Sequence, residues 1–106
     1  MLDIKNWLEV GTGLKVADTA FITKVNLPFI TFLEDKIMVG SDLENDIVDA
    51  NITIELYTAK VRKDLEKKIE NLMDVKAFKY SKSRMWVESE KCFETTYDFN
   101  FLERNE

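Results

Sequence analysis

The sequence NITIELY at residues 51–57, followed by KVRKDLEKKIENLM at residues 60–73, decides the fold of this chain. In the first segment the apolar residues Ile52, Ile54 and Leu56 alternate with other residues, which predicts a strand with one buried face. In the second segment apolar residues recur every three or four positions, which predicts an amphipathic helix. A strand followed closely by such a helix is typical of an α+β domain in which the helix packs on a sheet.

The helix is expected to run from Ala59 to about Met73, with Thr58 as its N-cap. Its other face is charged. The favourably ordered pair Asp64 and Lys68 contributes only about 0.2–0.5 kcal/mol, so packing of the apolar stripe should dominate the stability of this helix. The residues of the stripe are Val61, Leu65, Ile69, Leu72 and Met73.

Shorter apolar segments upstream predict further strands. Residues 20–22 are a weak candidate, and residues 29–33 are a stronger one because Pro28 is tolerated at the start of a strand. The polar residues 34–36 indicate a turn, after which residues 37–39 can return antiparallel.

Downstream of the helix, two more strand signals appear. Residues 78–80 and 85–87 flank the polar residues 81–84, which predicts a hairpin. Residues 93–101 alternate strictly between apolar or threonine residues and polar ones, which predicts a long half-buried strand. Residues 103–106 are expected to fray.

A short helix is predicted near the N-terminus, over residues 2–10. Asp3 is its expected N-cap, and Gly11 and Gly13 should end it. Together these elements predict a single α+β domain over residues 1–106. Its sheet should be mostly antiparallel, with an N-terminal helix and one long amphipathic helix packed on one face.

The composition excludes several kinds of active site. The chain has no histidine, so Ser-His-Asp and Cys-His nucleophiles and histidine-containing zinc sites cannot form. The single Cys92 has no second cysteine for an intramolecular disulfide or a thiolate metal cage, and favours a reducing compartment. We expect no catalytic residues, no cofactor and no metal. Neither a signal peptide nor a membrane-spanning segment is expected.

Charge is distributed in blocks along the chain, within a net charge of -5. Residues 34–55 carry seven acidic residues and one basic residue, whereas residues 60–84 carry nine basic and four acidic residues. Such blocks favour contact between a basic surface on one subunit and an acidic surface on the next. The alternative is a solvated helix face that happens to be lysine-rich. The candidate interface residues are Asp42, Glu44, Asp46, Asp49, Lys63, Lys67, Lys68, Arg84, Met85 and Trp86.

Residues 27–32 (LPFITF), the strand at 51–57 with its helix, and residues 93–99 (FETTYDF) together resemble small tail terminator proteins of long-tailed bacteriophages. These are also called tail completion or head-tail joining proteins. The resemblance covers about residues 27–102 and concerns the order and texture of the elements, since the family has no active-site motif.

The resemblance implies a structural virion protein, located in the tail or neck and assembled in the cytoplasm of the bacterial host. Subunits of this kind assemble into a ring, commonly a hexamer. The ring caps the tail tube, stops its polymerisation and offers a surface to the head connector, in some particles beside a sheath. DNA would meet such a ring only as passing cargo.

Two other functions remain open at this point. One is a small adaptor or inhibitor that docks its acidic loop, residues 41–49, on a basic partner. The other is an enzyme that uses carboxylates alone. Asp42, Glu44 and Asp46 have the spacing of the first ligands of a calcium loop, but Ile47 replaces the required glycine, which favours a solvated acidic loop.

Overall fold

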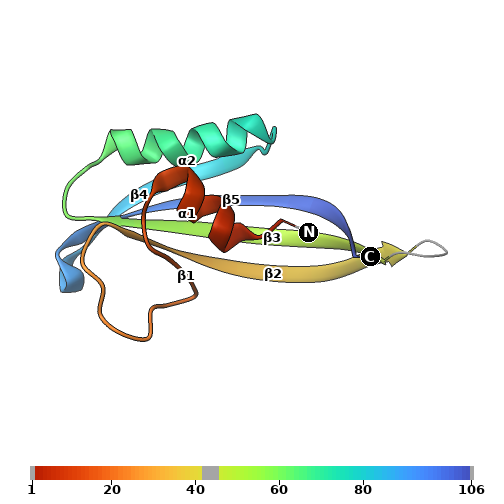
Figure 1. The fold of residues 1–106 in the computed structure, drawn as a ribbon, viewed down its shortest axis with the longest axis horizontal. Helices are drawn as coiled ribbons and strands as arrows, with labels where there is room; N and C mark the ends of the chain where they lie inside the picture. The colour runs from red at the N-terminus through yellow and green to blue at the C-terminus, as the bar shows by residue number, and fades with distance from the viewer. Residues whose placement is uncertain (1, 42–45, 106) are drawn as a thin grey trace.

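The computed structural model describes residues 2–41 and 46–105 as two helices on a five-stranded sheet of order β1-β2-β3-β5-β4 (Figure 1). The α+β class and the mostly antiparallel sheet are confirmed, since one pair, β1 with β2, is parallel and three are antiparallel. In chain order the elements are α1 (Ile4–Thr12), β1 (Val16–Asp18), β2 (Phe29–Ser41), β3 (Asp46–Thr58), α2 (Lys63–Val75), β4 (Tyr80–Val87), a 3-10 turn (Glu88–Glu90) and β5 (Cys92–Asn105).

The centre of the sheet is a long antiparallel ribbon of β2, β3 and β5. β2 pairs with β3 from Phe29 opposite Tyr57 to Ser41 opposite Asp46, with one bulge between Met38 and Gly40. The predicted turn at residues 34–36 and the separate return strand at 37–39 are therefore wrong. The polar residues belong to the same strand, because this half of β2 extends past the helices and is not required to bury its side chains (Figure 1).

The first strand differs from its prediction. Residues 20–22 lie in the loop between β1 and β2 and form no strand. Instead Val16, Ala17 and Asp18 pair in parallel with residues 30–32 of β2. A three-residue parallel strand has too few residues to show a periodic pattern, so the sequence carried no signal for it.

The N-terminal helix α1 is confirmed. The Asp3 carboxylate accepts a hydrogen bond from the Asn6 amide at 3.1 Å, and Gly13 ends the helix with φ 75°. Gly11, expected to end the helix, instead lies within it and faces α2. A Cβ at this position would collide with the Leu72 side chain, so the glycine lets the two helices approach closely.

Helix α2 is shorter than predicted, with 13 residues from Lys63 to Val75. Thr58 does not cap it. Thr58 is buried at the end of β3, opposite Phe93, and Val61 lies in the connection before the helix. The expectation of one long amphipathic helix is thus not borne out, because residues 59–62 form the connection between β3 and α2 and not the first turn of the helix. Leu65, Ile69 and Met73 are buried as predicted.

The predicted hairpin at residues 78–87 is wrong. Residues 80–87 form one edge strand, β4, which pairs with β5 from Tyr80 opposite Phe99 to Val87 opposite Cys92. The polar residues at 81–84 resemble a turn in sequence because an edge strand outside the core can be polar throughout. In β5 the predicted alternation is confirmed, but the strand continues to Asn105, so the expected fraying of residues 103–105 is also wrong.

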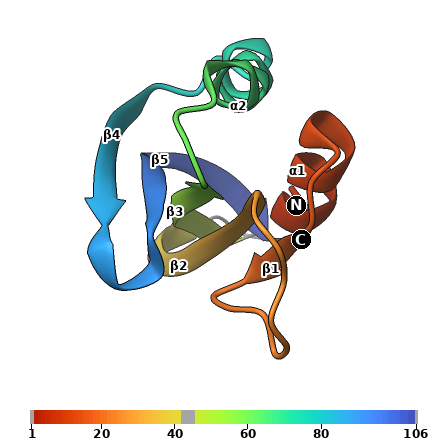
Figure 2. The ribbon, with the colours of Figure 1, turned by 90° about the vertical axis from the view of Figure 1, so that its left-hand side faces the viewer.

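Both helices pack on one face of the sheet, here called the helix face, and leave the opposite face, the open face, without a helix over it (Figure 2). Alternate strand residues point into the helix face, as the burial pattern of β3 shows. Trp7 of α1 packs edge-on against Phe78 at 6.0 Å and Phe99 at 6.3 Å between ring centroids. The buried core consists of Ile4, Leu8, Val16, Ile30, Phe32, Ala50, Ile52, Ile54, Leu56, Leu65, Ile69, Met73, Tyr97 and Phe99.

Candidate interaction surfaces

Helix α2 is fastened to edge strand β4 through a buried carboxylate, Glu66. The Arg84 guanidinium donates to both Glu66 oxygens, at 2.7 and 3.0 Å, and Lys82 Nζ donates to Oε1 at 2.8 Å. Lys82 also donates to Glu70 at 2.6 Å, and the Tyr97 hydroxyl donates to the same Glu70 oxygen at 2.7 Å. Charge-assisted bonds of this kind fix the position of the helix over the strand.

Electrostatics at this network favour the ionised carboxylates. Burial acts to raise the pKa of Glu66, but the hydrogen bonds from Arg84 and Lys82 outweigh it, and the net pKa is lowered. The pKa of Glu70 is lowered in the same way, with burial outweighed by bonds from Lys82 and Tyr97. Two of the basic residues on β4 are therefore occupied within the subunit.

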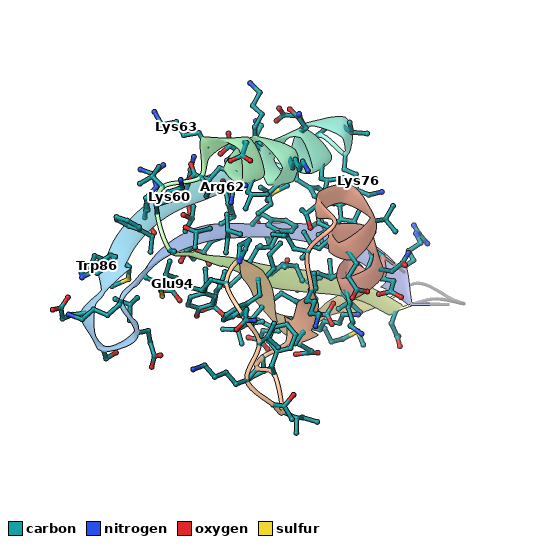
Figure 3. All side chains as sticks on the ribbon, turned by 60° about the vertical axis from the view of Figure 1, so that its left-hand side comes forward. Lys60, Arg62, Lys63, Lys76, Trp86 and Glu94 are labelled. Atoms are coloured by element: carbon teal, nitrogen blue, oxygen red, sulfur yellow. The ribbon has the colours of Figure 1, made fainter. Side chains whose placement is uncertain are left out.

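The outer side of α2 carries a second set of basic residues. Lys63, Lys67 and Lys68, here called the α2 lysines, are exposed, and among the described residues none of them has an ion-pair partner. Figure 3 shows Lys63 and Lys76 at the two ends of α2, on the outside of the molecule. The solvent-exposed side of α2, over the helix face of the sheet, is therefore basic.

The open face carries carboxylates from three strands. Glu55 of β3 lies beside Glu94 and Asp98 of β5. Burial raises the pKa of Glu55, a hydrogen bond from Thr31 lowers it, and the neighbouring negative charges of Glu94 and Asp98 raise it further, with a net increase. The molecule therefore presents opposite charge on its two sides, basic over α2 and acidic on the open face.

Cross-strand hydrogen bonds order the acidic side chains of the open face. The Tyr57 hydroxyl donates to Glu94 at 2.6 Å, and both burial and this carboxylate raise the pKa of Tyr57. Further bonds join adjacent strands between Thr31 and Glu55 at 2.9 Å, Thr53 and Asp98 at 2.7 Å, and Asn100 and Asp49 at 3.1 Å.

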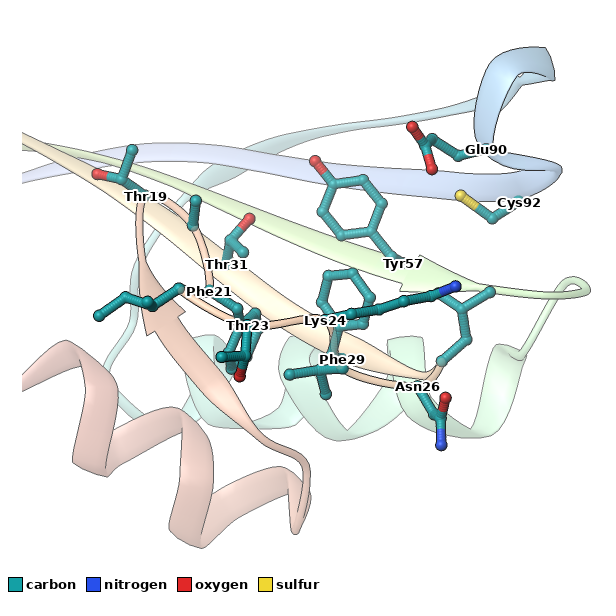
Figure 4. A pocket seen from close by; sticks show the side chains of 14 residues that line it. Thr19, Phe21, Thr23, Lys24, Asn26, Phe29, Thr31, Tyr57, Glu90 and Cys92 are labelled. Carbon is teal, nitrogen blue, oxygen red and sulfur yellow. The ribbon is translucent and has the colours of Figure 1, made fainter.

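A hollow of about 640 Å³ opens between the β1–β2 loop and one end of the sheet (Figure 4). Phe29 stacks on Tyr57 at 5.1 Å and meets Phe21 edge-on at 5.3 Å, so aromatic rings form much of its wall. Lys24 and Glu90 add one charge of each sign. This hollow could not be predicted from the sequence, because its wall is a loop folded back onto strands distant in sequence.

The structure locates eight of the ten candidate interface residues. Asp42 and Glu44 fall outside the described residues. Asp46 is exposed and Asp49 half-buried, and both lie in β3 rather than in a loop. The α2 lysines are exposed together on one helix, as expected.

The remaining three candidates lie in β4. Arg84 is engaged with Glu66, whereas Met85 is 57% and Trp86 44% exposed on the edge strand. The Trp86 indole donates to Glu88 at 2.6 Å and packs edge-on against Phe93. The predicted turn at residues 81–84 is absent, and all three candidates lie along one continuous edge strand.

Glu66 itself was missed from the sequence, although a signal for it exists. It lies three residues before Ile69 and seven before Met73, so it falls on the buried stripe of α2. A carboxylate on such a stripe requires a cationic partner, here supplied from β4.

Among residues 2–41 and 46–105, no helix is both long and apolar enough to cross a membrane. The same described residues contain no group of three or more acidic or cysteine side chains arranged to hold a metal ion.

No protein-family model matches this chain, and no curated protein matches it. Among solved structures, a chain from the virion of a native gene transfer agent particle is similar, with a TM-score of 0.65 and 13% sequence identity. The match covers 92% of this chain and 84% of that chain. At this identity the likeness shows a shared fold over nearly the whole described length.

Proposed function

We propose that this chain is a structural protein of a phage-like particle, and specifically a tail terminator. In this role, copies assemble into a ring, commonly a hexamer, that caps the tail tube and joins it to the head connector. The single observation that carries the proposal is the shared fold with a chain of a gene transfer agent virion, which covers most of both chains.

The distribution of charge supports assembly. A ring needs a contact in which two different surfaces of the same subunit meet, because identical patches would close a dimer instead. The basic outer side of α2 and the acidic residues of β2 and β3 provide two such surfaces. Complementary charge of this kind sets the orientation and register of the contact more than its affinity.

The proposal involves no catalysis and no cofactor. The acidic open face suits a channel wall, because carboxylates do not hold the phosphate backbone of passing DNA. The subunit would act through its shape and its two charged sides, as part of the tail or neck of a particle built in the cytoplasm of a bacterial host.

The test is self-association measured by native mass spectrometry over a range of protein and salt concentrations, followed by negative-stain microscopy of the multimers. A closed ring that binds the end of purified tail tubes is the expected result. A protein that remains monomeric at every concentration and does not bind tubes would refute the ring. A one-to-one complex with an unrelated protein would favour the adaptor instead.

A further inference from the structure

The sheet ends in two unpaired strand edges on opposite sides of the molecule. One is β4, which pairs with β5 on its inner side only. The other is the outer half of β2, residues 33–41, because β1 covers β2 only as far as Phe32. In the part of the chain that the structure describes, no strand pairs with either edge, so both offer free backbone N–H and C=O groups.

Resting on the ring proposed above, we propose that β4 of one copy pairs antiparallel with residues 33–41 of β2 in the next copy. The joined strands would make one continuous sheet around the ring. The two edges are comparable in length, since β4 has eight residues. Strand addition at free edges is a common mode of recognition, in which backbone hydrogen bonds hold the partner.

Most charged side chains at the two edges are held in ion pairs within the subunit, whereas Asp35 of β2 is exposed. Proteins commonly protect free edges with exposed lysines, but Lys36 reaches inward to Glu103 of β5 at 3.0 Å and also pairs with Glu34 of its own strand at 3.8 Å. On β4, Lys82 and Arg84 reach inward to Glu66. Apolar side chains and free backbone groups are exposed at each edge, beside Asp35 on β2 and Ser81 and Ser83 on β4.

Each edge presents large exposed apolar residues on both faces of the sheet, and Leu33 and Val39 add to them on β2. By the strand register, Trp86 and Met38 lie on the helix face, and Met85 and Ile37 lie on the open face. All four are between 44% and 57% exposed. An antiparallel joint that aligns Met85 with Ile37 also brings Trp86 within a diagonal cross-strand contact of Met38, so apolar residues meet on both faces.

Strand direction and level are compatible with closure. β4 runs antiparallel to β2 in the subunit, because three antiparallel pairings separate them. Rotation about an axis near the strand direction preserves this relation between copies. Following the register across β5 and β3, Tyr80 of β4 lies at the same height along the strands as Glu34 of β2. Pairing of β4 with residues 33–41 of the next copy therefore displaces that copy along the strand direction. A regular shift between neighbouring strands is what a closed, tilted sheet requires.

The joint also uses the charge pattern. Glu34 and Asp46 lie on the helix face of the sheet, by the same register that places Val48 there. When β4 of the neighbouring copy pairs with β2, Glu34 and Asp46 lie on the same side of the joined sheet as the α2 lysines of that neighbour, because its β4 runs beside its α2. The acidic and basic blocks of the sequence then meet across the joint between subunits.

The test is cross-linking of two variants that each add one exposed cysteine, Ile37→Cys and Met85→Cys, with a short bis-maleimide that tolerates a register shift of two residues. The native Cys92 is 3% exposed and does not compete. A mixture of the two variants should give a cross-linked dimer, whereas either variant alone should not. The control mixture combines Met85→Cys with Val10→Cys, since Val10 is 78% exposed on α1. As a second measurement, Ile37→Lys or Met85→Lys should weaken self-association roughly tenfold, and Val10→Lys should not.

The outcomes separate the two proposals. Multimers without the mixed cross-link, and with unchanged association of the lysine variants, would overturn edge pairing while the ring stands. A cross-link from Ile37→Cys alone would show a two-fold joint of β2 with β2, and would also overturn edge pairing. Absence of multimers at any concentration would remove the proposed ring itself.

Discussion

Replacing Glu66 by glutamine should destabilise the subunit in a pH-dependent way. Removing one member of a buried ion pair costs about 3–5 kcal/mol when its partner remains buried. Here the Lys82 and Arg84 side chains are 32% and 31% exposed and can regain water, so we expect a lower value of roughly 2 kcal/mol. With an unfolding entropy of about 2.1 cal/mol/K per residue, this lowers the melting temperature by roughly 9 °C for 106 residues.

The pH dependence gives this prediction its sign. The folded-state pKa of Glu66 is below its unfolded value, because the bonds from Arg84 and Lys82 outweigh burial. Its contribution to stability is therefore complete above the unfolded pKa of about 4.3, and is lost as the pH falls through the folded pKa. Urea unfolding of wild type and Glu66→Gln at pH 7 and at acid pH measures this. Glu88→Gln, at an exposed pair with Lys91, is the control and should not change stability measurably. Equal stability of Glu66→Gln and wild type at pH 7, or a difference that does not shrink at acid pH, would refute the reasoning.

Three further predictions follow from the packing and the surface. Leu65→Asp should unfold the domain, because it puts a carboxylate at a position that is 4% exposed, which costs several kcal/mol. Circular dichroism measures this, with the exposed Val10→Asp as the control, and a folded Leu65→Asp variant would show that the stripe is not part of the core. Gly11→Ala should lower the free energy of unfolding by about 1 kcal/mol, because the clash with Leu72 exceeds the gain in helix propensity; a more stable variant in urea melts would contradict this. Changing the α2 lysines to glutamate should preserve the fold and weaken self-association, more at low salt than at high salt in native mass spectrometry; unchanged assembly would remove the role of charge but not the likeness of fold.

Strong periodic patterns predicted the elements that build the core. The alternation in residues 52–56 and 93–101 is confirmed. Leu65, Ile69 and Met73 of the predicted stripe are buried, whereas Val61 is 40% exposed and lies before α2. In these segments each side chain faces either core or solvent, so burial imposes the period on the sequence.

Prediction from sequence failed at the two free edges of the sheet. Residues 34–36 of β2 and 81–84 of β4 are polar and resemble turns, yet both lie within strands. Their strand conformation is set by pairing with β3 and β5, which are distant in sequence and leave no local signal. The same applies to the β1–β2 loop and its hollow, which depend on chain segments brought together by the sheet.

The candidate surface was predicted in part. Exposure of the α2 lysines followed from the helical stripe, because residues opposite buried ones face solvent. The sequence could not show that Arg84 is occupied by Glu66, since that contact joins residues 18 positions apart through the sheet. Nor could it show that Met85 and Trp86 lie on a free edge, because strand order is not a local property.

The position of β3 has a consequence for biosynthesis. This central strand pairs along its whole length with β5, residues 92–105, which leave the ribosome last of all the strands described. Until then one edge of β3 is unpaired, and the ribbon of β2, β3 and β5 is incomplete. Folding that depends on contacts so distant in sequence is slow, and its intermediates expose apolar surface and are prone to aggregate. We therefore expect the central ribbon to be completed only after β5 has left the ribosome.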